Sequence, residues 1–381
     1  MTIPSAAQKK NFVFRCLRCG EIQPASFVSL CHRCSGMVDV CHDLDGVRIH
    51  EAPTATERFF DLLPISDPAH LINLGEGQTP CLPAKNLARD WGLRGLYLKM
   101  ESANPTGTAK DRMAAVVLSM FREMGITEFV SCSTGNSSSA LARGISLVGG
   151  FTMRLFLGEA FASRLRFANG NAGIHLQVVP GAAFTEAFDL ARHKAEQAGL
   201  TFDAGFFNPA RREGLKLAYL EAVDQVPEDV THYFQAVSSA TGLWGSWKGA
   251  KELHVLRRIP FLPKMVGVQQ QSCNPMVRAW RESSAVILPH HIVPDPEGPA
   301  KPILRGDPSG SYPYVYQAIK DSGGALEDVT EKEMLQLQDE LQSRENLRCG
   351  LCSATALAAV RKMMRGGALD PASVVLVNMT D

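Results

Sequence analysis

The sequence lacks several features that would assign a chain to a class of protein at once. Its 39 basic and 39 acidic residues cancel, so no excess charge favours nucleic acid or an anionic membrane as a partner. No apolar run reaches the length of a membrane-spanning helix, and the first ten residues carry no apolar core of the secretory-signal kind. Internal repeats and low-complexity tracts are also absent. We therefore expect a cytoplasmic protein that acts on a small molecule.

The composition that remains is that of a large globular enzyme. Of 381 residues, 45% are hydrophobic and 20% are charged, which is enough for two domains with cores of their own. The ten cysteines are better explained as reduced thiols and metal ligands than as a disulfide framework, because disulfide frameworks belong to small secreted chains.

Four of the cysteines form a metal-ligand pattern near the start of the chain. Two Cys-x-x-Cys pairs, Cys16 with Cys19 and Cys31 with Cys34, are separated by eleven residues. This spacing allows four thiolates to surround one tetrahedral Zn²⁺ and leaves no position for a substrate, so it predicts a structural zinc ribbon. The alternative is a set of reduced cysteines or a redox pair. The later pair Cys349 and Cys352 has no second pair beside it, and we interpret it as a turn before a helix.

Beyond the ribbon, strand patterns alternate with helix patterns. Strands are expected at residues 96–100, 129–133, 154–157, 233–237, 265–269 and 374–377, and helices at 110–124, 136–148, 183–198, 242–256 and 354–364. Repeated βα units predict open parallel sheets covered by helices. Ligands of such folds bind beyond the carboxyl ends of the strands.

Lys110 has the placement of a nucleophilic lysine. It follows a strand-like stretch and a turn through Asn104-Pro105-Thr106-Gly107, and it lies in the first turn of the expected helix. The positive end of the helix dipole, together with burial, would disfavour the charged amine and leave it nucleophilic near neutral pH. A lone lysine at a helix start is usually an exposed surface residue, so the surrounding motif decides the interpretation.

The stretch from Asn104 to Arg112 resembles the lysine motif of the threonine synthase-like family of pyridoxal-phosphate enzymes, with Thr108 and Ala109 in place of Ser and Phe. Three more motifs follow the family's order, at residues 74–80, 133–139 and 208–214. The resemblance implies an α/β protein of fold type II, like the tryptophan synthase β chain. Such a protein has two open parallel-sheet domains with the cofactor in the cleft between them, plus the small zinc ribbon. The implied boundaries are 1–48 for the ribbon, 49–100 with 195–381 for the large cofactor domain, and 101–194 for the smaller domain.

The resemblance also implies roles for single residues. Lys110 would bind the aldehyde of pyridoxal 5'-phosphate and act as the catalytic base, and Asn136 would contact the phenolic oxygen of the ring. The expected phosphate loop lies at a helix start, where backbone N–H groups can bind an anion, and consists of Ser238, Ser239, Ala240, Thr241 and Gly242. Candidates for the substrate carboxylate and leaving phosphate are Thr79, Ser133, Thr134, Ser137, Ser138 and Arg211.

The end of the last expected strand supplies a partner for the pyridine nitrogen. Thr380 matches the family's hydroxyl position there. Neighbouring strand residues point to opposite faces, so only one of Thr380 and Asp381 can reach the ring. An uncharged hydroxyl would leave the nitrogen unprotonated, which suits elimination and replacement reactions.

These residues imply a lyase that eliminates or replaces a group on a phosphorylated amino acid. The leading expectation is conversion of O-phospho-L-homoserine and water to L-threonine and phosphate. A cysteate synthase-like enzyme acting on O-phosphoserine or a specialised amino acid is the alternative, favoured by the hydroxyl-rich loop at 238–242 and by Cys352-Ser353, where relatives tend to have Glu-Pro. A cofactor-free regulatory or scaffolding protein is the third. No nucleic-acid or membrane partner is expected, and a homodimer is the assembly considered.

Overall fold

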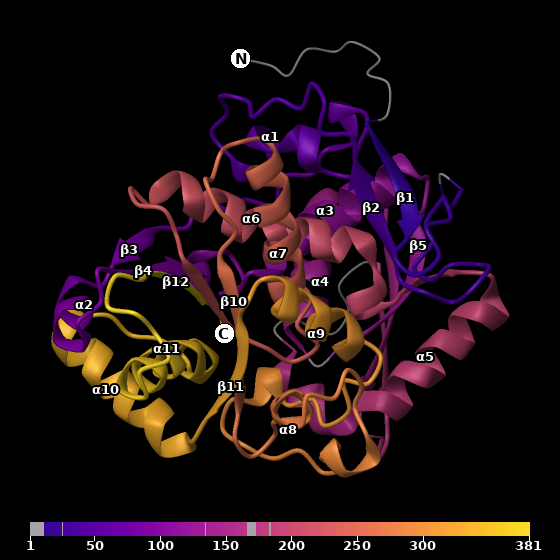
Figure 1. Ribbon diagram of the computed structural model, residues 1–381. Helices are drawn as coiled ribbons and strands as arrows, with labels where there is room; N and C mark the ends of the chain where they lie inside the picture. Colours follow the sequence, from indigo (N-terminus) through magenta and orange to yellow (C-terminus); the bar gives the residue numbers. More distant parts are fainter. Residues whose placement is uncertain (1–10, 25, 134, 166–172, 183) are drawn as a thin grey trace. The chain divides into compact units, whose positions relative to one another are not determined.

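The chain forms two compact units, each built on its own sheets. The computed structural model describes residues 11–24, 26–133, 135–165, 173–182 and 184–381 (Figure 1). The first unit comprises Met1–Gly77 and Lys110–Leu217, and the second comprises Gln78–Ala109 and Ala218–Asp381. Among the described residues, none of the helices combines the length and the apolar character needed to cross a membrane.

The first unit contains a two-stranded and a four-stranded sheet. Strands β1 (Phe12–Cys16) and β2 (Val38–His42) pair antiparallel. The other sheet is parallel, in the order β7-β6-β5-β8. Its strands are β5 (Glu128–Cys132), β6 (Thr152–Gly158), β7 (Ile174–Val179) and β8 (Thr201–Asp203). The helices are α1 (Ala55–Arg58), α3 (Lys110–Glu123), α4 (Asn136–Val148), α5 (Phe184–Ala198) and α6 (Pro209–Gln225), the last of which continues into the second unit.

Helix α5 covers this parallel sheet with a stripe of small residues. Ala187, Ala191 and Ala195 recur every four positions, which places them on one face of the helix, and all three are buried against Val130 and Phe156 of the sheet. The short side chains let the helix lie close to the strands.

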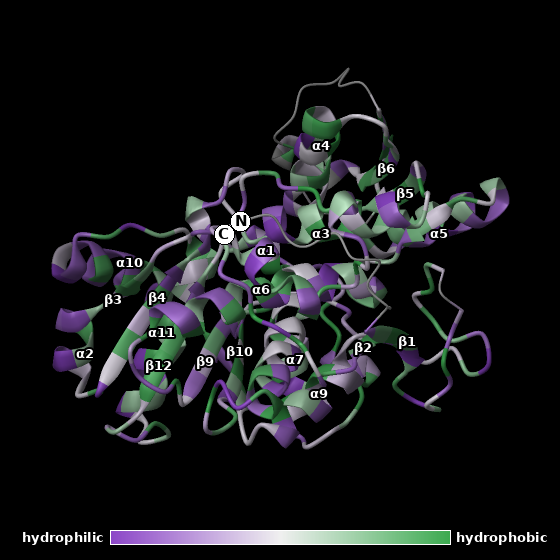
Figure 2. Ribbon diagram, turned by 90° about the horizontal axis from the view of Figure 1, so that it is seen from above, coloured by the Kyte–Doolittle hydropathy of each residue, from purple (hydrophilic) through white to green (hydrophobic). Residues whose placement is uncertain are grey.

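The second unit is built on a six-stranded sheet in the order β11-β10-β9-β12-β4-β3, in which only β3 runs antiparallel. The strands are β3 (Cys81–Pro83), β4 (Gly95–Met100), β9 (His232–Ala236), β10 (Lys264–Gln270), β11 (Ala325–Val329) and β12 (Val374–Met379). The helices are α2 (Lys85–Trp91), α7 (Thr241–Val255), α8 (Pro275–Arg281), α9 (Tyr312–Asp321), α10 (Glu331–Glu345) and α11 (Leu351–Arg365). Every residue of the central strand β12 is buried, as a strand covered on both faces requires. Figure 2, coloured by hydropathy, shows hydrophobic stretches in green beside the β12 label.

The strand register brings predicted site segments to one edge of this sheet. Met379 of β12 lies beside Met100 of β4, and Asn378 lies beside Gln235 of β9. The residues that follow these strands therefore emerge at the same edge. They include Thr380, the turn that leads to Lys110, and the loop at 238–242.

The expected α/β fold with parallel sheets is confirmed, and each of the six expected strands and five expected helices matches an observed element within a few residues. The expected helix start at 183 lies outside the described residues, and α11 begins at Leu351, three residues before the expected start at 354. The sequence patterns did not predict strands β1, β2, β3, β7, β8 and β11 or helices α1, α2, α8, α9 and α10. None of the β7 residues is buried, and β11 carries two acidic residues, so neither of these two strands shows a continuous buried apolar run.

Candidate active site and metal centre

Lys110 is the first residue of helix α3 and is partly buried. The turn before it is held internally. Asn104 donates to the carbonyl of Glu101 (2.9 Å) and to its carboxylate (3.0 Å), and Gly107 adopts a φ of +80° that favours glycine. The amide of Ala109 donates to the Thr380 hydroxyl at 3.1 Å. The structure therefore brings the expected pyridine partner next to the residue that precedes the expected cofactor lysine.

The last two side chains of the chain have separate environments. The Asp381 carboxylate accepts hydrogen bonds from the Gly350 amide (3.0 Å), the Ser353 amide (3.1 Å) and the Ser353 hydroxyl (2.9 Å). It thus caps the amino end of α11, which explains why that helix starts earlier than the sequence pattern indicated. Burial, reinforced by the charge of Asp381, raises the pKa of Cys349 to about 12, so this thiol stays protonated at neutral pH.

The loop at 238–242 has the form of an anion-binding helix start. Ala240, at the N-cap of α7, adopts a left-handed φ of +63°, and its side chain offers no cap to the first N–H groups of the helix. The hydroxyls of Ser239 and Thr241 lie 2.9 Å apart. A Cβ at Gly242 would lie 2.4 Å from the side-chain nitrogen Nε2 of Gln235, so the helix start lies directly against that side chain. A helix start without a side-chain cap from its N-cap residue, together with the hydroxyls of Ser239 and Thr241, fits a phosphate group.

The candidate Thr79 belongs to a buried polar network in the second unit. Its hydroxyl donates to Glu101 at 2.7 Å, and its amide donates to Glu221 at 3.1 Å. Lys99, with only 1% of its surface exposed, donates to the Thr79 carbonyl (2.6 Å) and to Glu221. Lys99 and Glu221 were not recognised from sequence. A lysine within an otherwise apolar strand was the available signal, since lysine is rarely buried without a partner.

The loop before α4 is built from its own serines. Ser133 accepts from the amides of Gly135 (3.1 Å) and Ser138 (3.3 Å), and the Ser138 hydroxyl donates to the Gly135 carbonyl (2.9 Å). Asn136 is the first residue of α4 and is partly buried, and Ser137 follows it in the first turn. Thr134 lies outside the described residues. Two of the candidate hydroxyls therefore also shape the loop that would present the others.

Arg211 is held by a buried carboxylate. Its Nε donates to Asp203 at 2.7 Å and a terminal nitrogen donates to the other oxygen of the same group, while Arg211 is only 6% exposed. Asp203 also accepts from Asn208 (2.7 Å) and Ser131 (2.9 Å). A bidentate pair of this kind satisfies much of the guanidinium. Arg211 is for that reason the weakest of the substrate candidates.

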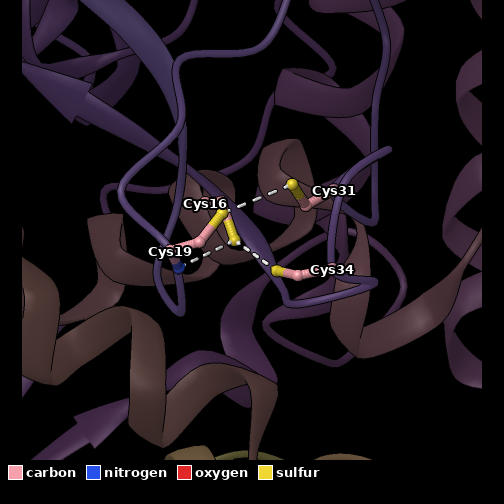
Figure 3. A group of neighbouring side chains, drawn as sticks. All are labelled: Cys16, Cys19, Cys31 and Cys34. Atoms are coloured by element: carbon pink, nitrogen blue, oxygen red, sulfur yellow. Dashed lines mark hydrogen bonds between the residues drawn. The ribbon is translucent and has the colours of Figure 1, made fainter.

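The four amino-terminal cysteines lie close together, as Figure 3 shows. The four Sγ atoms all lie within 4.8 Å of one another, with Cys16 and Cys34 at 3.5 Å and Cys19 and Cys31 at 3.7 Å. A tetrahedral ion with Zn–S bonds of about 2.3 Å requires sulfur atoms about 3.8 Å apart. All four are free thiols. The donor set and the two measured separations are therefore close to what a tetrahedral zinc ion requires.

Backbone amides support the same cluster. The amides of Arg18 and Cys19 approach the Cys16 sulfur at 3.4 and 3.5 Å, and the amide of Arg33 approaches the Cys31 sulfur at 3.4 Å. Donors directed at sulfur stabilise thiolates, which are the forms that bind metal.

Comparison with known proteins gives a consistent family. The family model for pyridoxal-phosphate dependent enzymes matches residues 72–381. A threonine synthase from Methanocaldococcus jannaschii is 31% identical over 369 residues, which cover 93% of this chain and 88% of that protein. A cysteate synthase from Methanosarcina barkeri is 26% identical over 389 residues, covering 97% and 91%. Among solved structures, maize serine racemase superposes with a TM-score of 0.65 at 16% identity over 79% of this chain and 87% of that one, a similarity of fold.

Proposed function

Because this chain belongs to the family of pyridoxal-phosphate dependent enzymes, we propose that Lys110 binds the cofactor and that the enzyme eliminates or replaces a group on a phosphorylated amino acid. The similarity to threonine synthases along 93% of the chain carries this proposal. The hydrogen bond that the Ala109 amide donates to the Thr380 hydroxyl also supports it, because this bond places the residue before Lys110 at the end of strand β12.

The favoured reaction is conversion of O-phospho-L-homoserine and water to L-threonine and phosphate. A cysteate synthase-like reaction on O-phosphoserine is the second candidate. The 26% identity to a cysteate synthase over 97% of this chain supports it.

Each proposed group has a distinct task. When bound, the cofactor supplies an electron-withdrawing ring that stabilises negative charge at the substrate α-carbon. The Lys110 amine takes the α-proton and returns a proton to the product. The helix start at 238–242 would hold the cofactor phosphate, and Asn136 would contact the ring. Thr380 would offer the ring nitrogen an uncharged hydroxyl.

The proposed substrate contacts are Thr79, Ser133, Thr134, Ser137 and Ser138, with Arg211 less favoured. The proposed domains remain 1–48, 49–100 with 195–381, and 101–194. The division of the strands between the two larger sheets supports this proposal in outline, although β8 at Thr201–Asp203 joins the four-stranded sheet from beyond residue 194. The compact units also differ from it, because residues 49–77 and 195–217 belong to the first unit.

We also propose that Cys16, Cys19, Cys31 and Cys34 bind one structural Zn²⁺, because the sulfur separations match a closed tetrahedral site. Metal analysis should give about one zinc per chain. Cys16→Ser should lose the ion, whereas Cys81→Ser, at a cysteine outside the cluster, should keep it. Zinc-free wild-type protein after expression in zinc-replete medium would contradict the proposal.

Phosphate release tests the function. The purified enzyme is incubated with O-phospho-L-homoserine, or with O-phosphoserine together with sulfite, the nucleophile that a cysteate product requires. Phosphate and the amino-acid product are measured, with Lys110→Ala as the control. Faster release from phosphohomoserine, with threonine as product, supports the favoured reaction. Faster release from phosphoserine supports the second candidate. Release from neither, in a protein without the cofactor's visible absorbance, would refute the function and favour a cofactor-free role.

A further inference from the structure

Two buried polar contacts join strand β2 to helix α6. Arg212 contacts the Asp39 carboxylate through Nε (3.1 Å) and a terminal nitrogen (2.9 Å). His42 Nε2 lies 3.1 Å from the Glu213 carboxylate, which also accepts from Lys216. The side chains of Arg212, His42, Glu213 and Lys216 are fully buried, and that of Asp39 is 4% exposed.

Contacts of this kind fix the position of the elements they join. A buried charge is costly unless its partner and its remaining hydrogen bonds are in place, so displacement of either element is strongly opposed. Arg212 is further held by the carbonyls of Val38 and Phe206. Strand β2 and the start of α6 should therefore move together.

Strand β2 is also joined to the cysteine cluster, through its pairing with β1. In the β1–β2 ladder, Cys16 pairs with Val38 and Arg15 pairs with Asp39, so a metal ligand lies one ladder position from the Arg212 partner. Gly36 fits directly against the cluster, because a Cβ there would lie 2.9 Å from the Cys16 sulfur. The geometry of the four thiols thus sets where β2 begins.

Helix α6 in turn touches the helix that carries Lys110. A Cβ at Gly214 would lie 2.6 Å from the Arg112 carbonyl oxygen and 2.7 Å from the Met113 Cα. These are backbone atoms two and three residues after Lys110. The two helices are therefore in backbone contact at the first turn of α3, next to the side chains that anchor β2.

We propose that the metal-loaded cysteine cluster is a positioning element for Lys110, acting through β2, the Asp39–Arg212 and His42–Glu213 contacts, and the Gly214 contact with α3. The inference rests on the proposed role of Lys110. On this inference the ribbon helps to fix the position of helix α3, which begins at Lys110. His42 is then a positioning residue that does not contact the substrate.

Paired variants at His42 test this connection. Leucine has a similar volume but cannot donate to Glu213, whereas glutamine can donate from a similar position. Hydrogen exchange is measured by mass spectrometry on full-length protein purified with its cofactor, in peptides from 110–123 and 209–217. His42→Leu should keep its zinc and exchange at least about tenfold faster in both segments, since Glu213 loses a buried partner. His42→Gln should restore wild-type exchange.

Two further measurements separate positioning from general loosening. The pH midpoint of the cofactor's visible absorbance should shift in His42→Leu and return in His42→Gln, because that midpoint reports the surroundings of the lysine. Arg33→Gln, which breaks an exposed ion pair with Glu21 on the same ribbon, should change neither reading.

Removal of zinc with a chelator should reproduce the His42→Leu pattern. Unchanged exchange in 110–123 after both zinc removal and the leucine substitution would overturn the inference. If His42→Leu does not fold, Asp39→Asn, which keeps a hydrogen-bond acceptor, replaces it with the same expected direction. Hydrogen exchange needs no bound cofactor, so a wild-type protein that lacks the visible band would refute the proposed function while the exchange result still decides the inference.

Discussion

We expect Gly214→Ala to lower the catalytic rate strongly while lowering the free energy of unfolding only slightly. The added Cβ would lie 2.6 Å from the Arg112 carbonyl oxygen and 2.7 Å from the Met113 Cα, both of them backbone atoms that cannot rotate away. Ordinary contact would require the two helices to move apart by roughly 1 Å. The displaced segment is the first turn of α3, which begins at Lys110.

The effects on stability and on activity differ in size. Overpacking costs about 1–3 kcal/mol, and replacement of a helical glycine by alanine recovers about 1 kcal/mol, so the free energy of unfolding should fall by no more than about 2 kcal/mol. A misplacement of about 1 Å in a catalytic group can cost about a hundredfold in rate. We therefore expect kcat to fall by about two orders of magnitude while the protein remains folded.

The assay measures kcat for phosphate release together with urea unfolding. Gly366→Ala is the matched control, because Gly366 has a right-handed φ of −83° and its nearest atom would lie 3.4 Å from the new Cβ. That control should keep full activity and gain a few tenths of a kcal/mol in stability. A Gly214→Ala enzyme with wild-type kcat and wild-type unfolding would refute the argument that this close approach positions Lys110.

Three further predictions follow from single residues. Lys110→Ala should abolish turnover and leave far-UV circular dichroism unchanged, and full activity in that variant would disprove the mechanism. Thr241→Leu should weaken retention of the cofactor, measured by dialysis and absorbance, because a bulky side chain would crowd the phosphate-binding helix start; retention equal to wild type would exclude this loop. Burial, with Lys264 nearby, lowers the pKa of His232 from 6.5 to about 4, so the folded state excludes a proton that the unfolded chain accepts. Stability should therefore fall between about pH 6.5 and 4, by at most about 3 kcal/mol, and His232→Gln should flatten that slope in urea titrations.

Local patterns in the sequence were sufficient for much of the architecture. The alternation of strands and helices is visible because apolar spacing follows the period of each element, and helix α3 begins at Lys110 as the turn residues indicated. The two Cys-x-x-Cys pairs likewise come together, since short spacings within each pair leave few other arrangements for the thiols.

Local sequence patterns do not predict the long-range polar contacts in and around the candidate site. Asp381 caps α11 from 28 and 31 residues away, Lys99 reaches Glu221 across 122 residues, and Arg212 reaches Asp39 across 173. None of these separations has a local signature, because they depend on which strands become neighbours in the sheets.

The sequence by itself therefore determined the class of fold and the family, and it supplied Lys110 as the proposed reactive lysine; all of these rest on short-range spacing and residue type. Only the tertiary structure decided which side chains of the motifs are already bound by other parts of the protein and which remain available to a cofactor or substrate. In the folded chain Arg211 is hydrogen-bonded to Asp203, and the Asp381 carboxylate is hydrogen-bonded to the start of α11. The Thr380 hydroxyl lies against the segment that precedes Lys110. The physical reason is that a buried charge or hydrogen-bonding group must find its partner wherever the folded chain places one.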